Sequence, residues 1–290
     1  MTYPFVLGTA QLGAHYGITN SYGCPSDEDV QELLEYSLIK GINFLDTASA
    51  YGNSLERISN FYSGKRNIQL NLINKFSVKD DFDRTYEDLL KTLEKAGLEK
   101  FYGLLIHDLA NLSYQNEKRL LSFLQKMKQE NIVDKVGASI YAPQDLTGIL
   151  DVYPIDLIQC PLNLFDQRLL NPDMFDKFKQ RNIEVHARSL FLQGVLLSHE
   201  LPPTLNALRP LWKVYNHALL ETGLSPLHFI MSWVKSLKSI DKWVIGVNRR
   251  DELAEVMQAY DESDENLDYN WSIFNAPHES TIDPRNWATK

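Results

Sequence analysis

The chain alternates, about eight times, between a short apolar run and a longer stretch with helical periodicity. The short runs are rich in Val, Ile, Leu and Phe, and they are apolar throughout, which is typical of parallel strands buried on both faces. They begin near Phe5, Ile42, Leu70, Tyr102, Asp134, Ile155, Ile183 and Lys242. Each intervening stretch is long enough for the crossover that joins parallel strands. The alternation therefore predicts a parallel sheet with helices between its strands.

Residues 27–39 illustrate why the longer stretches are expected to be helices. Ser26 is a favourable N-cap, acidic side chains fill the first turn, and Gly41 supplies a stop. Apolar residues recur at the spacing of one helix face: Val30, Leu33, Leu34 and Leu38. The same reasoning predicts helices within 83–97, 114–131, 172–182, 207–223 and 225–237.

The number of units decides between two parallel-sheet architectures. Eight strand-and-helix units in roughly 250 residues predict an α/β fold of the (β/α)8 TIM-barrel type. A doubly wound sheet is the alternative, but it usually contains fewer units. No Pro- or Ser-rich linker interrupts the series, so we expect a single domain, with the barrel in residues 1–260. A long loop is expected at 190–204.

Residues 261–290 are predicted to form an irregular C-terminal tail. The segment is acidic and aromatic, and it shows neither strand nor helix periodicity. Its large aromatic side chains argue that it packs on the barrel: Tyr269, Trp271, Phe274 and Trp287.

Composition excludes several classes of protein. The net charge of −9, without any Lys/Arg-rich block, argues against nucleic acid as a partner. No apolar run approaches the ~18 residues of a membrane span, and the N-terminus lacks the regions of a signal peptide. We therefore expect a cytoplasmic protein without membrane contact. Cys24 and Cys160 are too few for a disulfide framework, and Cys160 is expected to be buried.

Four chemically active residues lie at or just past the C-terminal ends of the second, third and fourth predicted strands. Asp46 and Tyr51 lie in NFLDTASAYG, Lys75 lies in LINKFS, and His107 lies in LLIHD. In a barrel these strand ends converge on the face that carries catalysis. We therefore expect the four side chains to share one pocket.

The four residues suit proton transfer. Tyr is a weak acid with an unperturbed pKa of about 10, and a neighbouring ammonium favours the phenolate. Lys75 can supply that charge, and Asp46 can hold Lys75 charged and in place. His107 can orient a carbonyl oxygen or share the proton. These four residues fit a reaction in which the substrate oxygen gains a proton while a hydride is transferred to the carbon bonded to it.

Each of the four residues also has a structural explanation when it is taken alone. Asp46 can be a helix cap and Lys75 a structural ion-pair partner. Tyr51 can be a packed surface aromatic, and His107 a hydrogen-bonded structural histidine. Their joint placement at successive strand ends favours the catalytic interpretation.

The order Asp-x4-Tyr, then Lys, then His on successive strands resembles the aldo-keto reductase superfamily, in particular bacterial aldo/keto reductases. The likeness covers nearly the whole chain, in LGTAQLG, GINFLDTASAYG, INKFS, LIHD, KVGASIY, IQCPLNLFDQR, IEVHARSLFLQGVL and VIGVNRRDEL. The resemblance implies a barrel that binds NADP(H) or NAD(H) at its mouth, needs no metal and interconverts a carbonyl and an alcohol. Consistently, the chain contains no G-x-G-x-x-G fingerprint.

The resemblance also implies roles for individual residues. Tyr51 would be the general acid in reduction and the base in oxidation, tuned by Lys75 and Asp46. His107 would help to place the substrate carbonyl. Positions that match cofactor contacts are Thr9, Ala10, Asp46, Ser139, Gln159, Arg188, Leu190, Gly194, Gly246, Asn248 and Arg249. Two residues on loops that border the pocket are candidates for substrate binding: Tyr16 and Asn163.

Two positions depart from the family pattern. Relatives often stack an aromatic ring on the nicotinamide after strand 7, whereas this chain has Arg188, whose flat guanidinium can also stack. Many relatives place a cation where Glu252 stands. Arg249 and Arg250 can meet a 2′-phosphate, so NADP(H) is favoured, but Glu252 can accept from a ribose hydroxyl, so NAD(H) stays possible.

We therefore expect an NAD(P)H-dependent oxidoreductase that reduces an aldehyde, ketone or sugar carbonyl, or catalyses the reverse reaction. A Schiff-base aldolase or lyase with Lys75 as nucleophile is the second hypothesis. A cofactor-sensing binding protein on the same barrel is the third. The expected partner is a small carbonyl or alcohol substrate, and a monomer is expected because no heptad seam is evident.

Overall fold

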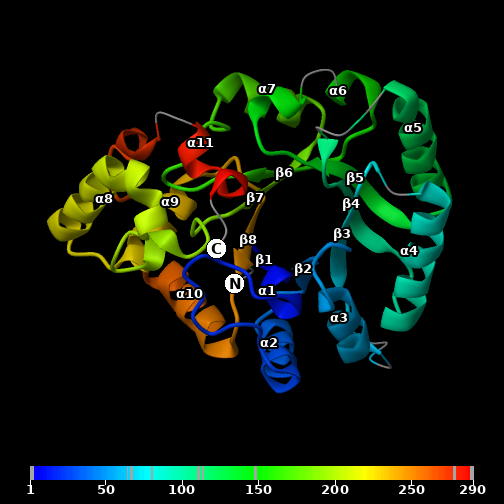
Figure 1. Ribbon diagram of the computed structural model, residues 1–290, viewed down its shortest axis with the longest axis horizontal. Helices are drawn as coiled ribbons and strands as arrows, with labels where there is room; N and C mark the ends of the chain where they lie inside the picture. Colours follow the sequence, from blue (N-terminus) through cyan, green and yellow to red (C-terminus); the bar gives the residue numbers. More distant parts are fainter. Residues whose placement is uncertain are drawn as a thin grey trace.

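The computed structural model shows a closed barrel of parallel strands surrounded by helices (Figure 1). It describes residues 3–63, 65, 68–79, 81–109, 112, 114–146, 149–276 and 279–287. Within these residues the strands pair in chain order and β1 closes on β8. The eight strands are β1 (Phe5–Gly8), β2 (Phe44–Asp46), β3 (Asn71–Phe76), β4 (Phe101–Ile106), β5 (Val133–Ser139), β6 (Leu157–Pro161), β7 (Glu184–Arg188) and β8 (Lys242–Gly246). The predicted (β/α)8 barrel is confirmed, and the doubly wound sheet is excluded.

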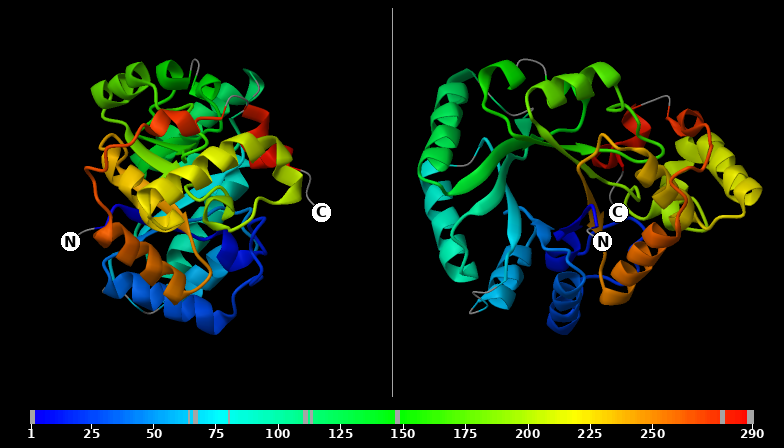
Figure 2. Two further views of the ribbon diagram at one scale, coloured as in Figure 1. Left: turned by 90° about the vertical axis from the view of Figure 1, so that its left-hand side faces the viewer. Right: turned by 180° about the vertical axis from the view of Figure 1, so that it is seen from behind.

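The longer helices surround the strands in Figure 1 and in the right-hand view of Figure 2. In the described part of the chain the helices are α1 (Ala10–Gly13), α2 (Asp27–Ile39), α3 (Ser54–Tyr62), α4 (Phe82–Ala96), α5 (Tyr114–Gln129), α6 (Ile149–Val152), α7 (Pro172–Gln180), α8 (Arg209–Thr222), α9 (Pro226–Ser236), α10 (Arg250–Glu262) and α11 (Glu279–Ile282). Short 3-10 turns occupy Pro143–Leu146, Val195–Leu197, Pro203–Leu208, Trp271–Phe274 and Pro284–Asn286. None of the helices described is long and apolar enough to cross a membrane.

The predicted helix boundaries follow from local chemistry. Before α2, the Ser26 hydroxyl accepts from the Asp29 backbone N–H at 3.1 Å, and the Asp29 carboxylate accepts from the Ser26 backbone N–H at 3.0 Å. This reciprocal pair satisfies two N–H groups that the helix leaves free. Beyond α4, α5 and α7 the chain turns through left-handed residues with φ of 67°, 57° and 53°: Gly97, Asn131 and Asn182. Gly and Asn tolerate this conformation, which ends the helices where predicted.

The barrel interior is built in layers that place the polar residues. Its apolar middle layer consists of Val6, Ile73, Leu105, Leu157 and Val244. Residues two positions apart in a strand share one face of the sheet. Two positions further along, toward the carboxyl ends, the inward face therefore carries Gly8, Lys75, His107, Gln159 and Gly246. The apolar layer thus forms the floor of a polar site.

The chain beyond α10 packs on the side of the barrel that carries α8 and α9 (Figures 1 and 2). Phe274 is fully buried, with its ring against Tyr215 and Phe229. The Ala276 backbone N–H donates to the Phe165 carbonyl at 2.9 Å. Other large aromatics of this segment are partly buried against the core: Tyr269, Trp271 and Trp287. Residues 277–278 and 288–290 of the predicted tail lie outside the described residues.

Candidate active site

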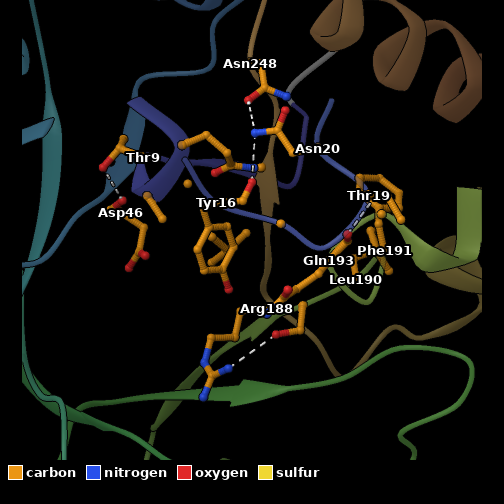
Figure 3. A pocket seen from close by; sticks show the side chains of 18 of the residues that line it. Thr9, Tyr16, Thr19, Asn20, Asp46, Arg188, Leu190, Phe191, Gln193 and Asn248 are labelled. Carbon is orange, nitrogen blue, oxygen red and sulfur yellow. Dashed lines mark hydrogen bonds between the residues drawn. The ribbon is translucent and has the colours of Figure 1, made fainter. Parts of the chain in front are cut away.

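A cavity of about 540 Å³ opens at the carboxyl ends of the strands. Thirteen residues singled out from the sequence lie in its wall: Thr9, Ala10, Tyr16, Asp46, Tyr51, His107, Ser139, Arg188, Leu190, Gly194, Gly246, Asn248 and Glu252. Lys75 and Gln159 are buried beside it and contact Asp46. Figure 3 shows Asp46 and Asn248 on different sides of the cavity, with Tyr16 between them. The strand ends therefore bring most of the predicted residues together.

Asp46, Lys75 and Tyr51 form a hydrogen-bonded chain. Asp46 ends β2, and its carboxylate accepts from the Lys75 ammonium at 2.5 Å. The same ammonium donates to the Thr47 carbonyl at 3.2 Å and to the Tyr51 hydroxyl at 3.4 Å. The other carboxylate oxygen of Asp46 accepts from the Gln159 amide at 2.7 Å. Both charges of the pair are thus satisfied by several partners.

The electrostatics of this chain depend on burial. Lys75 is 1% exposed and Asp46 is 3% exposed. Burial alone would lower the pKa of the Lys75 ammonium, but the charge of Asp46 and the phenol of Tyr51 outweigh it and raise that pKa above its ordinary value of 10.5. Lys75 is therefore a fixed positive charge directed at the Tyr51 hydroxyl.

His107 follows the last residue of β4 and lies beside Tyr51. The two rings meet edge to face, with centroids 6.2 Å apart. Burial lowers the pKa of His107 below its ordinary value of 6.5, and the charges of Lys75 and Arg188 lower it further. The imidazole is therefore neutral at neutral pH, with one N–H available for a substrate oxygen. Tyr51 and His107 together border the cavity where a carbonyl oxygen would need a proton.

Ser139, the last residue of β5, is paired in register with Gln159, in the middle of β6. Both are buried. The Gln159 side-chain oxygen has no hydrogen-bond partner among the described residues, although its amide nitrogen donates to Asp46. A buried acceptor without a donor is costly, so this oxygen suits a ligand that carries an amide N–H. A nicotinamide carboxamide fits that requirement.

Gly246 and Asn248 lie at the far end of the cavity, before α10. The Glu252 carboxylate turns back and accepts from the Asn248 backbone N–H at 2.7 Å and from its side-chain amide at 3.4 Å. Arg249 lies outside the cavity wall, with its guanidinium 4.7 Å from the Tyr22 ring centroid. Glu252 therefore accepts the hydrogen bond of the Asn248 backbone N–H, which could otherwise donate to a phosphate group.

Two loops meet at the edge of the cavity. The Gln193 side chain accepts from the Ile18 backbone N–H at 3.2 Å, and its carbonyl accepts from the Thr19 hydroxyl at 3.0 Å. Gln193 has a φ of 54°, which is unusual for a residue with a side chain. At the neighbouring Gly194 a Cβ atom would lie 1.9 Å from the Thr19 hydroxyl oxygen, so only glycine fits this contact. The loop after β7 is thereby fixed against the loop after α1.

Arg188 lies in the cavity wall as expected, whereas Asn163 does not. The Arg188 guanidinium lies 4.3 Å from the centroid of the Tyr141 ring. Asn163 is buried outside the cavity wall, and its side chain is engaged with the backbone of Phe165, Asp166 and Ser189. Its amide therefore shapes the loop after β6, and a role in substrate binding stays a prediction.

The cavity wall also contains residues that the sequence did not single out: Gln11, Asn20, Tyr141, Phe191 and Gln193. Gln11 and Tyr141 follow strand ends by two or three residues, which is a usable signal in a barrel. The others belong to loops whose conformation depends on contacts distant in sequence.

Comparison with known proteins gives a consistent result. The model of the aldo/keto reductase family matches residues 4–269. No curated protein matches the chain. The glycerol dehydrogenase AKR11B4 from Gluconobacter oxydans is 20% identical, with a TM-score of 0.68 over 90% of this chain and 87% of that one. The aldo-keto reductase AKR11C1 from Bacillus halodurans, in its holo form, is 16% identical, with a TM-score of 0.70 over 96% and 90%. At these identities the likeness to solved structures shows the barrel fold.

Proposed function

The chain belongs to the aldo/keto reductase family, and we propose that it reduces an aldehyde, ketone or sugar carbonyl with NAD(P)H, or catalyses the reverse reaction. Family membership makes it an oxidoreductase that acts on carbonyl and alcohol groups with a nicotinamide cofactor. The observation that carries the finer proposal is the position of the Lys75 ammonium. It lies 2.5 Å from the Asp46 carboxylate and 3.4 Å from the Tyr51 hydroxyl.

When bound, the nicotinamide supplies a hydride to the carbonyl carbon, or accepts one in the oxidation. Tyr51 donates its hydroxyl proton to the carbonyl oxygen, so that one O–H bond breaks as another forms. Lys75 stabilises the resulting phenolate, and Asp46 keeps Lys75 charged and oriented. The neutral His107 holds the carbonyl oxygen by donating a hydrogen bond. Because Lys75 and His107 are already in position before the reaction, they can stabilise the negative charge that develops in the transition state, which lowers the activation barrier.

The residues around the cavity fit a nicotinamide cofactor. Ser139 and the unpartnered oxygen of Gln159 would hold the carboxamide, and Thr9 and Ala10 would border the ring. Leu190 and Gly194 line the same cavity as Gly246 and Asn248, and the phosphates would lie beside the latter two. Asp46 contributes through Gln159, to which it is hydrogen-bonded.

We favour NADP(H) because Arg249 and Arg250 lie at the start of α10, where a 2′-phosphate would need positive charge. Glu252 opposes this preference, since its carboxylate already accepts from the Asn248 backbone N–H. The ratio of kcat/KM for NADPH to that for NADH measures which effect is larger. A ratio below one would contradict the proposed preference.

The Schiff-base alternative fits this geometry poorly. A Schiff-base lysine must be neutral and must reach the substrate. Lys75 is 1% exposed, has no place in the cavity wall, and carries a raised pKa because of Asp46 and Tyr51, against the effect of burial. Borohydride would therefore trap no substrate on Lys75. The same observations favour Lys75 as a fixed charge.

A substrate panel tests the proposed activity directly. The purified protein is incubated with aldehydes, ketones and aldoses, each with NADPH and with NADH, and the loss of reduced-nicotinamide absorbance is followed. We expect cofactor oxidation that depends on a carbonyl substrate. Tight NADPH binding without turnover of any panel member would favour the cofactor-sensing protein instead.

A further inference from the structure

Three arginines surround the loop after β5, and two of them are paired with acids. The Arg168 guanidinium contacts Asp166 through two nitrogens, each at 2.8 Å. The Arg285 guanidinium contacts Asp283 at 3.0 Å. Arg188 has no carboxylate partner among the residues that the structure describes. Of the three arginines, Arg188 is therefore the one whose positive charge no carboxylate balances among the described residues.

Arg188 is held in a fixed orientation despite lacking an acid. One terminal nitrogen donates to the Ile140 carbonyl at 3.0 Å, and the other donates to the Ser189 hydroxyl at 3.3 Å. The guanidinium also lies over the Tyr141 ring, and the Arg285 guanidinium lies 3.7 Å from the centroid of the same ring. These two donated bonds leave other N–H groups of the guanidinium free for a ligand.

The acids of the cavity wall do not neutralise Arg188. Asp46 is committed to Lys75 and Gln159. Glu252 is committed to the backbone N–H of Asn248. Those are the two acids in the cavity wall as it is described. A ligand that enters the cavity therefore meets a guanidinium whose charge is unbalanced.

Arg188 belongs to the catalytic side of the cavity. Burial and Lys75 lower the pKa of His107, and the charge of Arg188 adds to this effect, so the two groups interact electrostatically. Figure 3 shows the Tyr16 ring in the cavity, with its hydroxyl directed toward Arg188. The same figure shows Asn248, at the proposed phosphate end, on the opposite side. Arg188 is therefore placed to meet a substrate rather than the adenosine phosphates.

We propose that Arg188 is a specificity-determining residue that binds an anionic group, a carboxylate or a phosphate, on the carbonyl substrate. The proposal rests on the proposed carbonyl reduction and adds the chemical class of the substrate. A planar guanidinium with a fixed orientation suits both anions, because it can donate two parallel hydrogen bonds to their oxygens. The Tyr16 hydroxyl, on the same side, can donate a further bond.

Matched substrate pairs test this assignment. One pair is 4-carboxybenzaldehyde and 4-methylbenzaldehyde, and the other is glyceraldehyde 3-phosphate and glyceraldehyde, all at saturating reduced cofactor. We expect kcat/KM to favour one anionic member by about tenfold or more, and the pair with the larger preference identifies carboxylate or phosphate. Arg188→Gln should remove the preference mainly through KM, and Arg188→Lys should retain part of it.

Arg285→Gln is the matched control, since Arg285 lies over the same Tyr141 ring but is paired with Asp283. It should leave the preference unchanged. Because each preference is a ratio at saturating cofactor, a general loss of activity or of cofactor affinity cancels. An equal kcat/KM for charged and neutral members in the wild type would overturn the proposal, and so would a preference that survives in Arg188→Gln.

A binding measurement separates this proposal from the proposed activity. Calorimetric titration with 4-(hydroxymethyl)benzoate, 4-methylbenzyl alcohol and inorganic phosphate requires no turnover. If no carbonyl is reduced but an anion binds with a dependence on Arg188, the proposed reaction fails while the anion site stands. If neutral carbonyls are reduced and no anion binds, the reaction stands and the anion site is refuted.

Discussion

Replacing Asp46 by Asn tests the buried ion pair beneath the cavity. The substitution leaves a side-chain oxygen for the Gln159 amide, but it removes the negative charge 2.5 Å from the Lys75 ammonium. Because Lys75 is 1% exposed, water cannot replace the lost partner. Leaving one charge of a buried pair without compensation costs about 3–5 kcal/mol. We expect the free energy of unfolding at neutral pH to fall by that amount.

The pH dependence of this loss distinguishes an electrostatic cause from poor packing. In the wild type, Asp46 and Tyr51 outweigh burial and raise the pKa of Lys75 above 10.5, so its stabilising contribution is complete below that pH and is lost only as pH rises through the folded-state pKa. In Asp46→Asn the carboxylate no longer opposes burial, which is the largest influence, so the pKa of Lys75 falls below 10.5 although Tyr51 still favours the ammonium. The unfolded chain then binds the proton more readily, so the stability of the variant rises with pH and its deficit shrinks toward about pH 10.

Equilibrium urea unfolding, followed by the fluorescence of the buried Trp233 and Trp243, measures both effects. Asp88→Asn is the matched control, since it removes the same charge from an exposed pair with Lys91 at 3.2 Å. Exposed pairs contribute about 0–1 kcal/mol, so this control should change little. A deficit for Asp46→Asn below about 1 kcal/mol, or one that is constant with pH, would refute the reasoning.

Three further predictions concern other parts of the barrel. Gly137→Ala places a Cβ atom 1.9 Å from the Leu157 carbonyl, so the strands must separate, and urea unfolding should show a loss above about 4 kcal/mol. Phe274→Ala removes a fully buried ring from the C-terminal segment, and the unfolding free energy should fall by about 3–5 kcal/mol; a negligible loss would mean that this segment does not stabilise the barrel. The lowered pKa of His107, caused by burial and by Lys75, means that the unfolded chain is protonated first as pH falls through 6.5. The wild type should therefore lose stability relative to His107→Gln below that pH, and an NMR titration of His107 with a midpoint above 6.5 would contradict the account.

The sequence predicted the barrel and the convergence of most candidate site residues on one cavity, because both depend on local patterns. Every strand start was expected within two residues of where it lies, and Gly97, Asn131 and Asn182 adopt the left-handed conformation that their residue types favour. Lys75 and His107 follow inward apolar residues by two positions, so strand alternation directs them into the barrel.

Contacts between loops could not be predicted, since they join residues far apart in the chain. The left-handed Gln193 makes its contacts with Ile18 and Thr19 only because the barrel brings two loops together. Glu252 turns back onto the Asn248 N–H, which no motif indicated. The Tyr141 ring contacts the guanidinium groups of Arg188, in β7, and Arg285, in the C-terminal segment. The surroundings of Arg188 could not be predicted, because they join three distant parts of the chain.

Tyr51→Phe is the measurement that tests the central claim most directly. The substitution keeps the ring beside His107 but removes the hydroxyl that lies 3.4 Å from the Lys75 ammonium. Loss of a positioned proton donor should lower kcat by about 10²–10⁴-fold. Cofactor affinity, measured by fluorescence titration, should stay nearly the same because the hydroxyl serves the substrate oxygen. Unchanged turnover in this variant would contradict the proton-transfer role of Tyr51.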